Sequence, residues 1–226
     1  MADCFDKKLV IFDLDGCLVD TGGEIALMVN TVRQRLGLAP LPQDFVVAAV
    51  GKGLRKLFDA CMADAPELVE KAMALSPDIY VEISGTLAKP FPGVVETLRA
   101  LKGKRRIALA TNKIRRATEK LFDALGITQY FDTMCCADDC CLPKPHPACI
   151  LTILERLGVD AGDAVMVGDT PTDVLTAANA GVVTIAVTYG MAKPEAVRAA
   201  DPYLAAESME EVLSFLLPEQ ERSKAE

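Results

Sequence analysis

Features that mark a membrane, secreted or nucleic-acid-binding protein are missing from this sequence. No apolar run approaches the ~18 residues that a membrane-spanning helix requires. The N-terminal segment MADCFDKKLV lacks the layout of a signal peptide. We therefore expect a cytoplasmic protein that does not bind a membrane.

Positive charge is scarce as well. The formal net charge is −8, and the basic residues are scattered along the chain instead of being gathered in one segment. Such a chain would repel a nucleic-acid backbone, so we expect no nucleic-acid partner. The expected partner is a small molecule, and an anionic ligand would be held by a few directed groups. Both a monomer and a homodimer remain open.

The cysteine and histidine patterns favour neither disulfides nor a zinc site. A chain of 226 residues, 51% of them hydrophobic, can bury a core without disulfides, so its eight cysteines are expected to be reduced. Cys135, Cys136, Cys140 and Cys141 form adjacent pairs and lack the C-x-x-C spacing of zinc ligands. The single histidine, His146, lies between two prolines, which indicates a packed loop residue and not a catalytic acid.

Continuous apolar runs alternate with helical patterns along most of the chain. The runs predict buried strands at Leu9–Phe12, Arg106–Ala110, Thr133–Cys136, Ala164–Val167 and Val182–Val187. Helical patterns separate them at roughly Val94–Leu101, Arg115–Leu125, Ala148–Leu157 and Pro171–Ala180. This alternation predicts an α/β fold, a Rossmann-like doubly wound parallel sheet with helices on both faces.

The stretch between the first two strands is too long for a simple crossover. It has the pattern of several helices, with breaks at Pro40, Pro42 and Pro66. We predict a helical cap domain at residues 21–88, here called the insert, within a catalytic core made of residues 1–20 and 89–226. Asp20 is expected to cap the first helix of the insert.

Four polar clusters follow predicted strands, which is where open α/β sheets bind their ligands. In chain order they are Asp13-Leu14-Asp15-Gly16, Thr111-Asn112-Lys113, Lys144-Pro145-His146-Pro147 and Gly168-Asp169-Thr170-Pro171-Thr172-Asp173. Phosphoryl transfer needs a nucleophile, a proton donor and groups that neutralise the phosphate charge. Asp13 is the candidate nucleophile, which would form an aspartyl phosphate, and Asp15 is the candidate general acid and base. Because two carboxylates repel a phosphate dianion, Mg²⁺ is expected between them.

Together these motifs resemble those of the haloacid dehalogenase superfamily, in its branch with a small helical cap. The segments FDLDGCLVDT, TNK, KPHP and GDTPTD are similar to the phosphoglycolate-phosphatase-like family, and the match in order and spacing covers essentially the whole chain. The resemblance implies that Asp13, the backbone carbonyl of Asp15 and Asp169 hold Mg²⁺. It also implies that Thr111 and Lys144 bind the phosphate oxygens.

Further positions around the phosphate are candidates with less distinct roles. Gly16 would let the backbone turn and present its amides to the phosphate, and Asn112 is a second candidate for phosphate binding. Asp173 falls at the third position of a capping box that begins at Thr170, so helix capping and metal support are both open. Cys17 stands where the family usually has threonine, and its thiol beside the nucleophile suggests oxidative inhibition as a hypothesis.

The insert carries a small basic segment, GKGLRKLF. One interpretation is that Lys52, together with Arg55, binds an anionic leaving group such as the carboxylate of phosphoglycolate. The other is a solvated basic turn at the start of a helix. Both remain open.

The predicted function is magnesium-dependent hydrolysis of a small phosphomonoester, with 2-phosphoglycolate as the first candidate. Inorganic pyrophosphatase and sugar-phosphate mutase activity are alternatives, because the same core motifs serve all three. Dehalogenation is disfavoured, since Asp15 and Asp169 would be surplus to it, and phosphonate cleavage would need a desolvated lysine such as Lys52. A non-catalytic phosphate-binding module would not need an acid–base partner beside the nucleophile.

Overall fold

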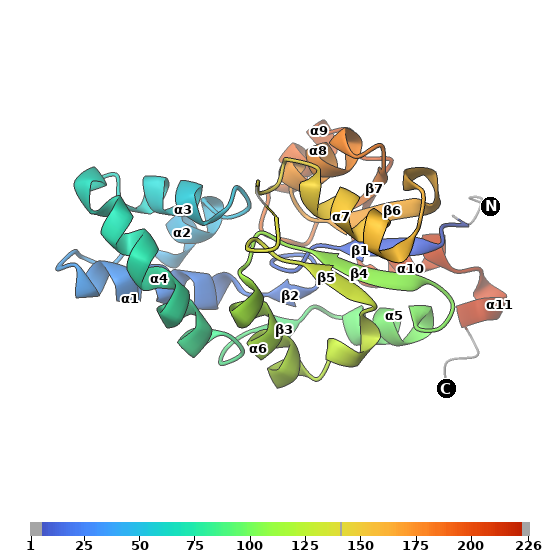
Figure 1. The fold of residues 1–226 in the computed structure, drawn as a ribbon, viewed down its shortest axis with the longest axis horizontal. Coiled ribbons are helices and arrows are strands. Elements are labelled where there is room, and N and C mark those ends of the chain that lie inside the picture. Colours follow the sequence, from blue (N-terminus) through green and yellow to red (C-terminus); the bar gives the residue numbers. More distant parts are fainter. Residues whose placement is uncertain (1–5, 141, 223–226) are drawn as a thin grey trace.

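A six-stranded parallel sheet forms the centre of the larger part of the molecule (Figure 1). The computed structural model describes residues 6–140 and 142–222. The strand order is β5-β4-β1-β6-β7-β8. The six strands are β1 (Leu9–Phe12), β4 (Arg106–Ala110), β5 (Thr133–Cys135), β6 (Ala164–Gly168), β7 (Val183–Val187) and β8 (Leu204–Ala206). This is the predicted Rossmann-like doubly wound sheet.

Alternate side chains of each strand pack against helices on opposite faces of the sheet. Val10 and Phe12 of β1 face the core cluster that covers α5 (Val94–Leu101), α6 (Arg115–Leu125) and α10 (Met209–Leu216). Leu9 and Ile11 face a second cluster, with α7 (Ala148–Leu157) and α8 (Pro171–Asn179). All four β1 residues are fully buried. Burial of one such side chain contributes about 1.5–3 kcal/mol, so packing on both faces holds β1 in a fixed position next to the residues that follow it.

The order in which strands are added to the sheet reverses beside β1. From β1 it continues to β4 and β5 on one side, and then crosses back to β6, β7 and β8 on the other. The two strands that pair with β1 are therefore the first strand of each half. In a doubly wound sheet, ligands bind at the carboxyl ends of the strands at this reversal. Asp13 follows β1 directly at that place.

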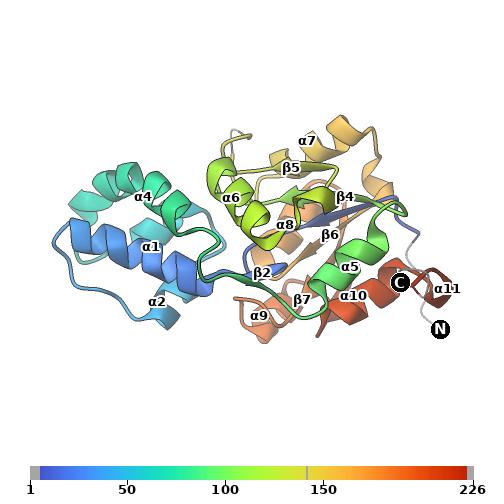
Figure 2. The ribbon, with the colours of Figure 1, turned by 90° about the horizontal axis from the view of Figure 1, so that it is seen from below.

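The insert lies beside the sheet in both ribbon views (Figures 1 and 2). Its α-helices are α1 (Gly22–Arg35), α2 (Gln43–Ala48), α3 (Leu54–Cys61) and α4 (Val69–Ile83), with a short 3₁₀ helix η1 (Pro66–Leu68) before α4. They bury an apolar cluster of their own, which includes Met28, Val32 and Phe58. Although α4 contains Pro77, the helix continues, and the Ser76 hydroxyl donates to the Met73 carbonyl that the proline nitrogen cannot reach.

Two adjacent segments join the insert to the sheet. The short strands β2 (Val19–Asp20) and β3 (Lys89–Pro90) pair antiparallel, with Asp20 opposite Lys89. The buried Glu24 carboxylate accepts hydrogen bonds from the backbone amides of Leu87 and Ala88, at 2.9 and 3.0 Å. The entry and the exit of the insert are thus tied together.

Several elements differ from the sequence-based expectations. The residue before the first insert helix is Thr21, and Asp20 instead accepts a 3.3 Å hydrogen bond from the first helical amide, that of Gly22. The strands β2, β3 and β8 and the helices α2, α9 (Pro194–Ala199), α10 and α11 (Glu219–Arg222) were not expected. Two further 3₁₀ helices are η2 (Thr128–Tyr130) and η3 (Ala161–Asp163). Within residues 6–140 and 142–222, no helix is long and apolar enough to cross a membrane.

Candidate active site

A pocket lies between the insert and the carboxyl ends of the strands. From the sheet side it is lined by Asp13, Asp15, Thr111, Asn112 and Lys144, all of them predicted site residues. The insert contributes mainly apolar side chains and the backbone at Gly51 and Gly53. The cavity volume is about 60 Å³. Residues that are far apart in the sequence therefore meet at one small site, as their positions after the strands predicted.

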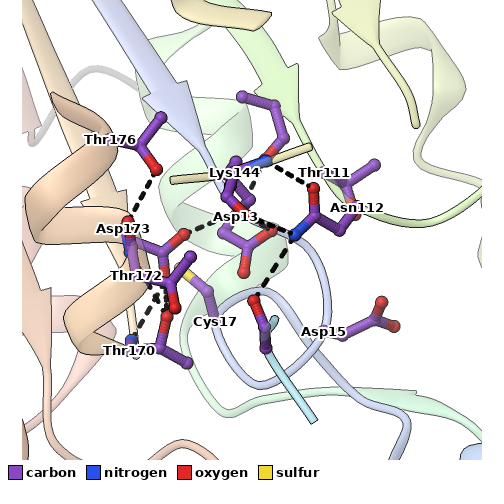
Figure 3. A network of polar contacts seen from close by, with 12 residues as sticks. Asp13, Asp15, Cys17, Thr111, Asn112, Lys144, Thr170, Thr172, Asp173 and Thr176 are labelled. Atoms are coloured by element: carbon purple, nitrogen blue, oxygen red, sulfur yellow. Dashed lines mark hydrogen bonds and ion pairs between the residues drawn. The ribbon is translucent and has the colours of Figure 1, made fainter. Parts of the chain in front are cut away.

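Asp13 and Lys144 form the centre of this site (Figure 3). Asp13 is buried, its amide donates to the Val167 carbonyl at 2.8 Å, and its Oδ1 lies 2.7 Å from Lys144 Nζ. Burial and the charge of Asp173 raise the pKa of the Asp13 carboxyl to about 7, against the opposing effect of Lys144. The side chain therefore lies at the end of β1 in a position where a strong neighbouring positive charge is needed to keep it ionised.

The ammonium of Lys144 is fully used by contacts within the protein. Its Nζ lies 2.7 Å from Oδ1 of both Asp13 and Asp173, and it donates to the Ala110 carbonyl at 3.0 Å. Burial lowers the pKa of Lys144, but the charges of Asp13 and Asp173 outweigh burial and raise this pKa above its ordinary value. The lysine is thus a fixed positive charge between two carboxylates.

Asn112 positions Lys144 through the backbone. The Asn112 Oδ1 accepts from the Lys144 amide at 2.9 Å, and its Nδ2 donates to the Lys144 carbonyl at 3.3 Å. The same Nδ2 also lies 3.4 Å from the carbonyl of Gly51 in the insert. Its predicted role in phosphate binding stays a prediction. The neighbouring Thr111 is buried, and its hydroxyl accepts from the Lys113 amide at 3.1 Å.

Three buried carboxylates gather where a metal ion was expected. One oxygen each from Asp13, Asp169 and Asp173 lies within 4.8 Å of the others. Asp169 Oδ2 accepts from the Met191 amide at 2.7 Å, whereas Oδ1 is buried without a hydrogen-bond partner among the described residues. Burial, followed by the charges of Asp173 and Asp13, raises the pKa of Asp169 well above its usual value. An unpartnered buried carboxylate oxygen in an all-oxygen donor set fits a hard cation such as Mg²⁺.

The backbone packs so closely around Asp169 that only glycine fits beside it. Gly16 has a φ of +90°, and a Cβ there would lie 2.2 Å from Asp169 Oδ2. A Cβ on Gly190 would lie 2.3 Å from both Cβ and Oδ2 of Asp169. Gly16 was predicted from its motif, but Gly190 was not, because its approach to Asp169 depends on the tertiary fold.

Asp173 acts as a helix cap and as a partner of Lys144. Its Oδ2 accepts from the Thr170 amide at 3.0 Å and from the Thr170 hydroxyl at 2.7 Å, and its amide donates to Thr170 Oγ1 at 3.3 Å. The predicted capping box at the start of α8 is therefore present. Its other oxygen contacts Lys144 Nζ. Metal support by Asp173 stays a prediction.

Asp15 lies apart from the network of Asp13, Lys144 and Asp173 (Figure 3). Its Oδ1 accepts from the Thr21 hydroxyl at 2.7 Å and lies 3.2 Å from Lys113 Nζ. Lys113 also contacts the hydroxyl of Tyr80, which belongs to α4 of the insert. The sequence analysis placed Lys113 in the second motif but gave it no role. Its position directly after Thr111 and Asn112 was the only available signal.

Cys17 is buried behind the nucleophile. Its Sγ contacts the Val167 carbonyl at 3.5 Å, and its own carbonyl accepts from the Tyr189 hydroxyl at 2.8 Å. Burial, followed by the charge of Asp13, raises the pKa of the Cys17 thiol well above its ordinary value. Because the thiolate is the form that reacts with oxidants, this environment disfavours the hypothesis of oxidative inhibition at Cys17.

The two residues predicted to bind a leaving group from the insert segment lie outside the pocket. Lys52 and Arg55 line an outer groove that adjoins the pocket and shares Asn112 and Lys144 with it. Lys52 is exposed, and Arg55 forms exposed ion pairs with Asp59 and Glu70. In this arrangement their side chains do not line the cavity beside Asp13, and contact with a leaving group stays a prediction.

The histidine and the cysteine cluster take no part in the pocket. His146 is exposed, not packed as expected, and its Nδ1 accepts from the Ala148 amide at 3.2 Å at the start of α7. Cys135 and Cys136 are buried, and the Sγ atoms of Cys135 and Cys140 are in contact at 2.7 Å. Cys141 lies outside the described residues. Among the residues that the structure describes, only the three aspartates at the pocket gather closely enough to hold a metal ion.

The profile of the haloacid dehalogenase-like hydrolases matches residues 10–187. The chain belongs to this family. It is 37% identical over 212 residues to a protein of Dickeya dadantii named probable phosphatase IndB, covering 92% of each chain. It is 35% identical over 194 residues to the phosphoglycolate phosphatase of Agrobacterium fabrum, covering 81% of this chain and 82% of the relative.

The fold of this haloacid dehalogenase-like hydrolase is also close to solved structures. A crystal structure from Haemophilus somnus, described as a predicted phosphoglycolate phosphatase, superposes with a TM-score of 0.86. The two chains are 25% identical, and the similarity covers 94% of this chain and 99% of the other. The predicted family, the α/β core and the assignment as a phosphatase are thereby confirmed.

Proposed function

We propose that this haloacid dehalogenase-like phosphatase is magnesium-dependent, acts through an aspartyl phosphate on Asp13, and hydrolyses a small phosphorylated metabolite. The observation that supports this most strongly is the position of Asp13, buried at the end of β1 and 2.7 Å from Lys144 Nζ. The unpartnered Asp169 Oδ1 beside it supports the metal requirement. The predicted division into a core and a capping insert is part of the proposal.

The proposed steps assign one task to each side chain. A carboxylate oxygen of Asp13 attacks phosphorus, and the bond from phosphorus to the ester oxygen breaks. Asp15 gives a proton to that oxygen and later takes one from the water that hydrolyses the aspartyl phosphate. Lys144 exchanges one of its contacts within the protein for a phosphate oxygen, and together with Thr111 it stabilises the charge that develops on the phosphate.

Asp13, Asp169 and the carbonyl of Asp15 would hold the Mg²⁺ ion, with Asp173 as a candidate supporting residue. The ion would supply charge neutralisation between the carboxylates and the phosphate dianion. Without it, three buried carboxylates face an anionic substrate, and Lys144 contacts two of the three. This imbalance motivates the metal requirement.

2-Phosphoglycolate is the first candidate substrate. Relatives at 31–37% identity include several proteins named phosphoglycolate phosphatase, and a cavity of about 60 Å³ favours a small leaving group. The insert covers this cavity and would exclude water when closed.

Turnover of a generic aryl phosphate tests the proposal. We expect activity with Mg²⁺, loss of activity in chelator and recovery when Mg²⁺ is restored. After rapid quenching with labelled substrate, the wild-type protein should carry covalent phosphate and the Asp13→Asn variant should not. Full activity in metal-free buffer, or labelling of the variant, would contradict the proposed mechanism.

A further inference from the structure

We propose that Lys113, together with the hydroxyl of Tyr80, binds a substrate carboxylate that lies next to the ester oxygen. The pocket would then select phosphate esters of 2-hydroxy acids. This inference rests on the proposed function, because it concerns the leaving-group side of the same pocket. The selective contact is thus made by a lysine that follows β4 and a tyrosine of α4, and not by the basic segment around Lys52.

Two lysines supply the positive charge in the pocket. Among the described residues that line it, the cations are Lys113 and Lys144. An ammonium group has three N–H donors, and Lys144 directs all three at Asp13, Asp173 and the Ala110 carbonyl. Lys113 has two hydrogen-bond partners among the described residues, Asp15 and Tyr80, which leaves one donor for a ligand.

Lys113 is also held in a fixed position. Its side chain is completely buried, and Nζ lies 3.8 Å from the centre of the Tyr80 ring. Asp15 supplies the neighbouring negative charge, at 3.2 Å. A desolvated ammonium that keeps a free donor is a strong site for a second carboxylate, because the interaction is not weakened by water.

Lys113 also lies beside the proposed general acid. In the proposed reaction Asp15 must reach the ester oxygen that it protonates. Because Lys113 Nζ is 3.2 Å from Asp15 Oδ1, a group bound to Lys113 lies beside that oxygen. In a phosphorylated 2-hydroxy acid, a single carbon atom separates the ester oxygen from the carboxyl carbon. A carboxylate one carbon further along would extend past this position.

The rest of the pocket wall is mainly apolar. The insert side is formed largely by Ile25, Met28, Leu54 and Leu57, which offer no hydrogen bond through their side chains. A charge placed elsewhere on the leaving group would lose its hydration there without gaining a partner. The wall therefore favours a leaving group whose single charge is at Lys113 and whose remaining atoms are apolar.

The position of Tyr80 links recognition to closure of the insert. Tyr80 belongs to α4, whereas Lys113 follows β4 in the sheet. A carboxylate bound by both would hold the insert against the sheet while the phosphate lies at Asp13. Substrates without this carboxylate would lack that contact.

The test compares esters that differ only in the carboxylate. 2-Phosphoglycolate and ethyl phosphate share the phosphate, the ester oxygen and the adjacent carbon, and the phosphate ester of 3-hydroxypropanoate moves the carboxylate one carbon away. We expect the wild-type kcat/KM for 2-phosphoglycolate to exceed that for either other ester by roughly ten- to a hundred-fold, the size of one charge-assisted contact. Lys113→Met keeps the length of the side chain and should bring the ratio of kcat/KM for 2-phosphoglycolate to kcat/KM for ethyl phosphate close to one. Lys113→Arg should restore part of the wild-type ratio. Tyr80→Phe should lower the ratio by about three- to ten-fold.

The control variant is Lys56→Ala, since Lys56 is an exposed lysine of α3 outside the pocket. Its ratio should equal that of the wild type. Equal wild-type kcat/KM values for the three esters, an unchanged ratio in Lys113→Met, or a loss of selectivity in Lys52→Ala alone would overturn the inference. No wild-type turnover of any ester would instead contradict the proposed function. If circular dichroism shows that Lys113→Met is unfolded, Tyr80→Phe decides the question.

Discussion

Replacing Asp169 by asparagine should remove most of the stabilisation that magnesium gives to the protein. One carboxylate oxygen each of Asp13, Asp169 and Asp173 lies within 4.8 Å of the others. At an effective dielectric constant of about 20, two unit charges at that distance repel by roughly 3–4 kcal/mol. Lys144 offsets part of this repulsion through its contacts with two of the three carboxylates. The remainder destabilises the metal-free protein.

Magnesium at about 100 times its dissociation constant would stabilise the native state by about 2.7 kcal/mol. For a chain of this size 1 kcal/mol changes the Tm by roughly 2–4 °C, so the wild-type Tm should rise by roughly 5–11 °C. Asp169→Asn retains an oxygen for the Met191 amide but loses the charge. We expect this variant to melt higher than the wild type in chelator and to lose most of the response to magnesium.

Scanning calorimetry in chelator and in saturating magnesium chloride measures both quantities. Asp44→Asn, on the exposed surface of α2, is the matched control and should keep the wild-type response. A wild-type Tm that is identical in the two buffers would refute the metal assignment. An undiminished magnesium shift in Asp169→Asn would show that Asp169 is not a ligand.

Three other predictions concern single residues. Asp13→Asn should abolish aryl phosphate turnover without changing the circular dichroism spectrum, and wild-type rates in the folded variant would rule out Asp13 as the nucleophile. Lys144→Ala should lower kcat/KM by about 10²–10³ and Thr111→Ala by less, as measured by steady-state kinetics; a Lys144 variant with wild-type kinetics would remove that residue from the mechanism. Gly16→Ala should lower the free energy of unfolding by more than ~1–2 kcal/mol in urea, because its Cβ would lie 2.2 Å from Asp169 Oδ2 at a φ of +90°. Gly23→Ala, in a helix with open space around it, should not be destabilising, and equal losses in the two variants would contradict the packing argument.

The sheet and the positions of the aspartates at its strand ends could be predicted because their signals are local. Each central strand is a continuous apolar run, and β1 and β6 are each followed at once by carboxylates. The helix α2 carried a weaker signal, since it has only six residues and contains two adjacent valines. The strand β8 has three residues and is defined by its pairing with β7, which no local pattern reveals.

Side-chain directions and long-range contacts could not be predicted in the same way. Nothing in the segment GKGLRKLF indicates that Lys52 lines the outer groove while the glycines on either side of it line the pocket. The contact between Lys113 and Tyr80 joins residues 33 positions apart and depends on how the insert folds back over the sheet. Such a contact follows from tertiary packing, so a motif can indicate the position of Lys113 but not its partner.

The pairing of β2 with β3 makes the whole insert the loop of a β-hairpin. Asp20 and Lys89 face each other across this hairpin, although the chain between them forms four α-helices. Antiparallel strands in this register can be joined by a turn of two residues, so the geometry of the sheet does not depend on the length of the chain between them. The helices that line the pocket from the insert can therefore change in length or number without displacing Asp13 and its neighbours. The apolar wall that the insert gives to the pocket and the carboxylates at the strand ends thus belong to structurally separable parts of one chain.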